Sequence, residues 1–305
     1  MSDALQWLEG VGDSPFFLWT HLNDAHRPYD PPEPYRSTFA DPYIGEIAFA
    51  DAQVGRLLDA LDRKRLRERT IVVVAGDHGE SLGDHGERDH GIFVYESVLH
   101  VPLIVRAPNV PPSRVSDVVR LVDVMPTVLD LLGVPRPATD GVSLADLLHG
   151  GTRHVDLEAY SESFYPERFG WSPLRSLRSG RFKFIEAPRR ELYDLERDPF
   201  EQRNLYQERR DLSNLMEQRL VTLEGNPPLQ HVADVSAVAP DVRQRLASLG
   251  YVASAPRAPG ESPAGLPDPK DCLGSDLARS DAPLPRACAR GHAYEAGSTE
   301  TLHSR

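Results

Sequence analysis

Short apolar runs and longer stretches with helical periodicity alternate over the first half of the chain. Residues 15–22, 70–76 and 101–106 are apolar runs bounded by turn residues, the pattern of strands buried on both faces of a sheet. Apolar residues recur at helical spacing over 41–64 and again over 118–134. This order of strand, helix, strand, strand and helix predicts an α/β fold with a mainly parallel or mixed sheet between helices.

The pattern changes after residue 150. Short runs with partial alternation, separated by turn residues, predict a small antiparallel sheet, and helices are expected at 205–224 and 240–252. From residue 253 onward the chain has seven prolines, both cysteines and no apolar periodicity, which is typical of a disordered tail. We therefore predict three segments: an α/β part at 1–150, a small antiparallel sheet with helices at 151–252, and a tail at 253–305.

Composition and charge narrow the function classes. The formal net charge is −12, from 34 Lys and Arg against 46 Asp and Glu. This balance disfavours general binding to nucleic acids or anionic membranes, since both need a net basic face. No stretch reaches the ~18 apolar residues of a membrane span, and the N-terminus shows no signal peptide. Cys272 and Cys288 give neither a disulfide framework nor a metal-binding Cys-x-x-Cys motif.

A dense group of metal- and proton-binding side chains follows the apolar run at 70–76 directly. In an open α/β sheet, ligands bind outside the carboxyl ends of the strands, and Gly76 and Gly79 allow a sharp turn there. Asp77 and His78 then offer a carboxylate and an imidazole, a pair of ligands that suits a divalent cation. The alternative is a solvated acidic loop. The whole group comprises Asp77, His78, Glu80, Asp84, His85, Glu87, Asp89 and His90.

The other polar residues near these strand ends are of two kinds. Asp84, Glu87 and Asp89 are expected to be solvated or to cap turns rather than to bind the cation.

His21 and His26 lie at the end of the run at 15–22, before a Pro-rich loop that cannot be helical. A lone histidine there would more often be structural. The presence of two, with an Arg-Pro-Tyr turn after His26, favours a site residue.

Five stretches of the chain resemble the sulfatase family of the alkaline phosphatase superfamily, in its arylsulfatase-like bacterial type. They are "FFLWTHLNDAHRPYDPPEPY", "YIGEIAFADAQVGRLLDAL", "TIVVVAGDHGESLGDHGERDHGIFVYESVLHVPLIVRAP", "VDVMPTVLDLLGVPRPATDGVSL" and "LRSGRFKFIEAPRRELYDLERDPFEQRNL". They follow in order at compatible spacing over residues 14–206, which is far more specific than any single motif. The resemblance implies an alkaline-phosphatase-like α/β sheet with its N-terminal part missing, a small C-terminal antiparallel subdomain, and hydrolysis of sulfate esters.

The resemblance also implies roles for four residues. Asp77 and His78 match the family's metal-binding pair, whose cation is usually Ca²⁺. Many members have Asn in place of His78, and an imidazole suits Zn²⁺ or Mn²⁺ better. His26 matches the histidine that contacts the sulfate or the leaving-group oxygen. His90 stands where many sulfatases have a lysine, so it would donate to a sulfate oxygen or protonate the leaving group.

One essential part of the family's chemistry is missing from these residues. The sulfatase nucleophile is a formylglycine made from the Cys or Ser of a Cys/Ser-x-Pro-Ser/Ala-Arg motif. Neither Cys272 nor Cys288 lies in such a motif, and the similar stretch at 110–114 begins with Val. Two further metal-binding aspartates of the family are also absent. We therefore expect the C-terminal portion of a sulfatase, an incomplete chain that is inactive alone.

Two alternatives remain open from the sequence. One is a phosphatase or phosphonate hydrolase of the same superfamily, because phosphate and sulfate have nearly the same shape and both reactions use a metal. The other is a non-catalytic remnant that keeps only part of the fold. In the sulfatase case the partner is a small-molecule or glycan sulfate ester, with no nucleic acid. Family members are often exported or periplasmic, but the sequence leaves the compartment of this chain open.

Overall fold

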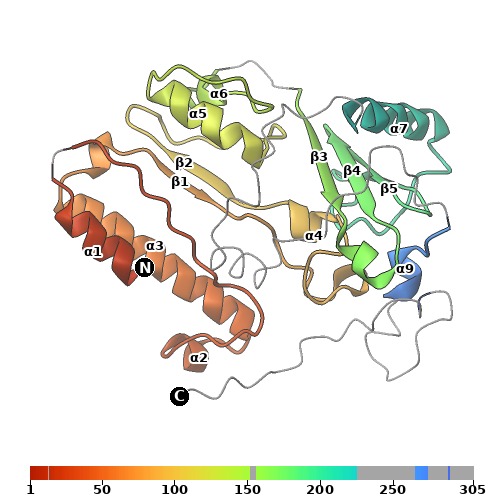
Figure 1. Cartoon of the computed structure of the whole chain (residues 1–305), viewed down its shortest axis with the longest axis horizontal. Helices are drawn as coiled ribbons and strands as arrows, with labels where there is room; N and C mark the ends of the chain where they lie inside the picture. The colour runs from red at the N-terminus through yellow and green to blue at the C-terminus, as the bar shows by residue number, and fades with distance from the viewer. Residues whose placement is uncertain (13, 152–155, 225–264, 274–287, 289–305) are drawn as a thin grey trace. The chain divides into compact units, whose positions relative to one another are not determined.

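The computed structural model describes residues 1–12, 14–151, 156–224, 265–273 and 288. The chain divides into two compact units, Met1–Val73 with Val105–Val110, and Val74–Ile104 with Pro111–Arg305. The helix predicted at 240–252 lies outside the described residues, as does most of the predicted tail. Figure 1 shows the elements along the chain.

The first unit is built on a long amphipathic helix, α3 (Pro42–Arg63), which confirms the helix predicted at 41–64. Asp41 caps this helix, because its side chain accepts a hydrogen bond from the backbone N–H of Tyr43 at 2.9 Å. The apolar side of α3 packs against α1 (Ser2–Gly10), and the core between them forms around Leu8, Ala60, Leu61 and Leu66. The shorter elements are α2 (Tyr35–Thr38) and the 3-10 turn η1 (Arg67–Arg69).

The buried strand predicted at 15–22 does not form among the described residues. Phe16 packs against the core of the first unit, whereas Phe17 and Trp19 are 79% and 81% exposed. An apolar run becomes a strand only when another strand pairs with its backbone N–H and C=O groups, and no described strand does so here. The prediction for these residues is therefore wrong.

The other two predicted strands are confirmed. They are β1 (Val72–Ala75) and β2 (Leu103–Arg106), which pair in a two-stranded sheet. The chain between them contains the 3-10 turn η2 (Asp84–Gly86) and the short helix α4 (Glu96–Leu99). The polar group that starts at Asp77 therefore follows the end of a strand, as the sequence predicts.

A four-stranded antiparallel sheet organises the second unit and confirms the sheet predicted after residue 150. Its order is β3 (Glu158–Ser163), β4 (Leu174–Ser179), β5 (Phe182–Glu186) and β6 (Glu191–Asp194). Leu177 pairs with Phe184, and Phe184 pairs with Leu192, so one face presents an apolar row. Helix α7 (Arg210–Glu224) covers this face through Met216 and Leu220 (Figure 1). It falls within the helix predicted at 205–224.

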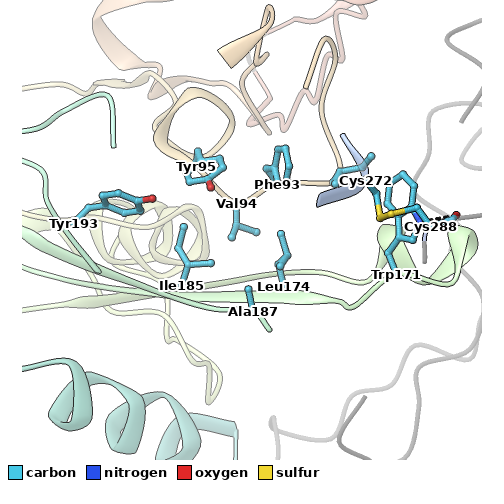
Figure 2. Close-up of a cluster of buried hydrophobic side chains, with 11 residues drawn as sticks. Phe93, Val94, Tyr95, Trp171, Leu174, Ile185, Ala187, Tyr193, Cys272 and Cys288 are labelled. Atoms are coloured by element: carbon cyan, nitrogen blue, oxygen red, sulfur yellow. Dashed lines mark hydrogen bonds between the residues drawn. A yellow bond between two sulfur atoms is a disulfide. The ribbon is translucent and has the colours of Figure 1, made fainter. Parts of the chain in front are cut away.

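The opposite face of the sheet is covered by the segment 92–95, which precedes α4. Ile92, Phe93, Val94 and Tyr95 are all buried there, in a cluster that includes Leu174 and Ile185 from the sheet (Figure 2). Since His90 comes only two residues earlier, this packing fixes the loop after β1 on the antiparallel sheet. The predicted polar site is thereby tied to the second half of the chain.

Part of the predicted tail is ordered. Helix α9 (Pro269–Cys272) joins the same cluster, and Cys272 forms a disulfide with Cys288 beside Trp171 (Figure 2). The two cysteines are 16 residues apart. Spacing alone does not determine whether such a pair is bonded, so this single bond was not predicted from the sequence.

The remaining elements lie between β2 and the sheet or within the sheet's connections. They are η3 (Leu121–Asp123), α5 (Val124–Leu131), α6 (Ala145–Leu148) and η4 (Tyr165–Phe169). The first two fall within the helix predicted at 118–134. In the part of the chain that the structure describes, no helix has the length and apolar character needed to span a bilayer.

Candidate active site

The turn that carries Asp77 and His78 is held against α4 by Gly79. The backbone N–H of Gly79 donates to the carbonyl of Val98 at 2.8 Å. A Cβ atom at Gly79 would lie 2.2 Å from the carbonyl oxygen of Ser97. Only glycine permits this close approach, so the sharp turn predicted from the sequence is required by packing.

Asp77 and His78 present two potential metal-binding atoms near each other. The Nδ1 atom of His78 lies 2.9 Å from the carbonyl oxygen of Gly79. A carbonyl can only accept, so this bond places the imidazole proton on Nδ1 and leaves the Nε2 lone pair for a metal. Nε2 lies 3.9 Å from Oδ2 of Asp77, while Oδ1 accepts the backbone N–H of His78. The donor set fits a divalent cation, but the described residues offer no group of three or more ligands.

His90 is the third predicted site residue that the structure brings to this place. Its ring stacks on the ring of His78 with centroids 4.0 Å apart, and its Nδ1 lies 3.1 Å from Oε1 of Glu80. Burial, the largest single influence, lowers the pKa of His90. The hydrogen bond that His90 donates to Glu80 and the charges of Glu80, Glu87 and Asp89 outweigh burial, so the pKa of His90 lies above its ordinary value.

Of the two roles expected for Glu87, solvation or capping, the structure shows capping, since its side chain binds backbone N–H groups. Glu87 is 1% exposed. Its carboxylate accepts the backbone N–H of Ile92 at 2.7 Å, that of Phe93 at 3.1 Å, and the hydroxyl of Ser81 at 3.3 Å. The hydrogen bonds of Glu87 therefore connect Ser81, early in the loop, to Ile92 and Phe93 at its end. Burial raises its pKa to about 7, against the effect of these hydrogen bonds.

We expect this buried carboxyl to make the protein less stable as the pH rises. The folded pKa of about 7 lies above the ordinary 4.5, so the folded state binds the proton more tightly than the unfolded state. The resulting stability is complete below pH 4.5 and is lost as the pH rises through 7. The loss is on the order of 3 kcal/mol.

Chemical denaturation at several pH values measures this effect. Glu87→Gln has nearly the same shape but no proton equilibrium at this position, so its free energy of unfolding should change less between pH 5 and pH 8 than that of the unaltered protein. Equal slopes for the two proteins would contradict the assignment.

His85, another member of the predicted polar group, does not join the site. Its ring stacks on Tyr95 with centroids 3.6 Å apart, and its Nε2 lies 3.2 Å from the carbonyl of Phe200. Burial lowers its pKa. The hydroxyl of Tyr95 in turn donates to Glu191 at 2.9 Å. His85 is therefore a packing residue that connects η2 to the sheet and the segment after it.

His26 belongs to the other compact unit, and its approach to Asp77 stays a prediction. Within its own unit it is well fixed. Glu46, a buried residue of α3, accepts the backbone N–H of His26 at 3.1 Å and that of Asp30 at 2.7 Å. Burial raises the pKa of Glu46. The role of Glu46 was not predicted, because Glu46 is buried whereas its apolar neighbour Ile47 is 43% exposed, the reverse of what the sequence pattern indicates. His21 is exposed.

Two family models match the chain. The model "Sulfatase" matches residues 1–134, and the model "N-sulphoglucosamine sulphohydrolase, C-terminal" matches residues 83–226. The second begins within the site loop and extends through the antiparallel sheet to α7.

Similar proteins come from bacteria and animals. The chain is 34% identical over 171 residues to a choline-sulfatase of Rhizobium meliloti (strain 1021). This match covers 53% of this chain and 32% of the relative. It is also 30% identical over 203 residues to arylsulfatase K of Mus musculus. This second match covers 61% of this chain and 35% of the mouse protein. The chain thus spans about a third of the length of these curated relatives.

Solved structures of similar proteins support the same fold. A 2-O GAG sulfatase, BT1596, matches with a TM-score of 0.53 and 28% identity, over 62% of this chain and 43% of that one. A phosphonate monoester hydrolase of Agrobacterium radiobacter matches with a TM-score of 0.51 and 28% identity, over 60% and 40%. The fold is the alkaline-phosphatase-like α/β fold of sulfatases. Together with the two family models, these similarities support a sulfatase-family protein that covers part of the family's domain.

Proposed function

We propose that this chain supplies the metal-binding and proton-donating side of a sulfuric ester hydrolase. The main support for this proposal is the grouping of Asp77, His78 and His90 on the loop after β1, in a chain that the sulfatase family model matches. Sulfatases generally use a metal ion and a formylglycine. The loop offers donors of the right chemistry for the metal, and His26 is the further catalytic residue of the proposal.

Each residue has a distinct part in the proposed reaction. Asp77 would hold the cation through Oδ2 and His78 through Nε2, which lie 3.9 Å apart. The cation, when bound, draws negative charge from the sulfate oxygens. His90 would donate a proton to the leaving-group oxygen as a general acid, and His26 would donate to the sulfate or to the same oxygen.

The identity of the metal is part of the proposal. We propose Ca²⁺, the usual cation of the family, with Zn²⁺ or Mn²⁺ as the alternatives that the imidazole of His78 favours. The substrate would be a sulfate ester of a small molecule or of a glycan. The names of the similar proteins support both classes, since one is a choline-sulfatase and another a 2-O GAG sulfatase.

A second candidate function is hydrolysis of phosphonate monoesters. The phosphonate monoester hydrolase of Agrobacterium radiobacter is 28% identical to this chain, the same identity as the GAG sulfatase. This similarity supports phosphonate monoester hydrolysis as an alternative. Both chemistries need a metal and a proton donor beside the leaving group. The sulfatase proposal has the broader support, because both family models and both curated relatives are sulfatases or sulphohydrolases.

We expect the 305 residues alone to give no measurable hydrolysis of p-nitrophenyl sulfate. They contain no Cys or Ser in a Cys/Ser-x-Pro-Ser/Ala-Arg motif, and the similar stretch at 110–114 begins with Val. A positioned nucleophile typically accounts for several orders of magnitude in rate. The assay follows the release of p-nitrophenol in the presence of Ca²⁺, Mn²⁺ or Zn²⁺.

A version of the protein extended by upstream coding sequence with the motif tests the class of reaction. Sulfate ester turnover that is lost when the motif Cys or Ser is changed to Ala supports the sulfatase proposal. Faster turnover of a phosphonate monoester supports the second candidate, and no turnover of either supports a non-catalytic remnant. If the 305 residues alone are active and Asp77→Ala removes that activity, they contain a nucleophile outside the Cys/Ser-x-Pro-Ser/Ala-Arg motif.

A further inference from the structure

Glu80 is a buried carboxylate within the site loop for which the proposed function gives no role. Its side chain is only 4% exposed. Its Oε1 lies 3.1 Å from Nδ1 of His90, whose side chain is 20% exposed. An ionised carboxylate can only accept hydrogen bonds, so Nδ1 of His90 carries the proton in this contact.

This hydrogen bond has a chemical consequence for the other ring nitrogen. With Nδ1 protonated, the neutral ring of His90 carries a lone pair on Nε2, and the protonated ring carries its transferable proton there. The ring of His90 also lies against the ring of His78, at 4.0 Å and 29°. The hydrogen bond to Glu80 therefore sets the tautomer of His90. This bond and the stacking on His78 together set the orientation of the ring.

We propose that Glu80 is a positioning residue for His90, whose carboxylate fixes the tautomer and orientation of the ring so that Nε2 exchanges the proton with the substrate. The inference rests on the proposed function for the identity of the substrate. The effect of Glu80 on the ring of His90 is a property of this chain alone and can be measured without turnover.

Glu87 provides the matched comparison. It is a buried carboxylate of the same loop, but its hydrogen bonds go to the backbone N–H groups of Ile92 and Phe93 and to the hydroxyl of Ser81. Loss of Glu87 should loosen the loop without removing the partner of Nδ1. A purely structural role for Glu80 would make the two residues equivalent for the ring of His90.

The test is nitrogen NMR of the protein with ¹⁵N-labelled histidine, at a pH where the ring of His90 is neutral. His90→Gln identifies its signals among those of the 11 histidines. We expect the proton on Nδ1 in the unaltered protein and in Glu87→Gln. In Glu80→Ala the proton should move largely to Nε2, the tautomer that an unrestrained histidine favours. Glu80→Gln, whose amide oxygen still accepts a hydrogen bond, should lie between these two.

Three results would overturn the inference. They are a proton on Nε2 in the unaltered protein, an unchanged tautomer in Glu80→Ala, and an equal change in Glu80→Ala and Glu87→Gln. Kinetics on the extended, active protein separates this inference from the proposed function. Under the proposal, Glu80→Ala lowers kcat by at least tenfold and changes KM little. The expected tautomer shift in a protein that hydrolyses no sulfate ester would sustain the positioning role while the proposed function fails.

Discussion

Asp77→Ala is expected to abolish the binding of divalent cations by this chain. The described residues offer Oδ2 of Asp77 and Nε2 of His78, 3.9 Å apart, and no larger group of ligands. Binding to the unaltered chain should be weak, because affinity grows with the number of ligands. Loss of a partner that only orients a ligand typically costs about 10- to 100-fold in affinity, so loss of one of two direct ligands should cost at least about 100-fold.

Isothermal titration calorimetry with Ca²⁺, Mn²⁺ and Zn²⁺ measures this effect and ranks the three metals. Asp84→Ala is the matched control, because Asp84 is an exposed residue of the same loop and its loss removes the same charge. Asp84→Ala should bind the cation as the unaltered chain does. Binding by Asp77→Ala within a few-fold of the control would show that the cation binds elsewhere.

Lys183→Met is expected to cost about 3–5 kcal/mol in the free energy of unfolding. Lys183 lies on β5 and is 1% exposed, and its Nζ is 3.0 Å from carboxylate oxygens of both Glu96 and Glu201. Glu201 also accepts the backbone N–H of Glu96, the first residue of α4, at 2.6 Å. Removal of the ammonium group leaves Glu201 buried without its cation, whereas Glu96 keeps an ion pair with Arg178 at 2.7 Å.

Two further measurements separate this mechanism from lost packing. Burial already raises the pKa of Glu201, so the destabilisation by Lys183→Met should be smaller at pH 5 than at pH 8, where the carboxylates must ionise. Adding Glu201→Gln to the variant should recover part of the loss. Arg203→Ala, which breaks an ion pair whose side chains are 72% and 55% exposed, should cost less than about 1 kcal/mol. A similar cost for both variants would contradict the mechanism.

Local sequence signals predicted the elements that need few distant partners. Helix α3 has its periodicity, the cap at Asp41 and Pro42 within a short stretch, so its position could be predicted closely. The strands β1 and β2 and the antiparallel sheet followed from apolar runs and alternation. Residues 15–22 show the same signal as β1 but form no described strand, because pairing depends on a neighbour that lies elsewhere in the sequence.

The candidate site was also predicted only in part, because some of its contacts depend on residues that are distant in the sequence. Asp77, His78 and His90 could be placed on one loop, because a strand end and two glycines define it. The burial of Glu87 could not, since its main hydrogen-bond donors are the backbone N–H groups of Ile92 and Phe93, which every residue type except proline possesses. The disulfide between Cys272 and Cys288 was also missed, because bonding depends on their meeting beside Trp171 and not on their spacing.

The burial of residues 92–95 against the antiparallel sheet has a consequence for engineering. A boundary near residue 150 looks suitable for cutting the chain or for exchanging its second half with that of a relative. Such a cut would separate Phe93 and Val94 from Leu174 and Ile185, with which they share a core. A chimaera that keeps the loop of His90 must therefore also keep the matching strands, or redesign both sides of that core together.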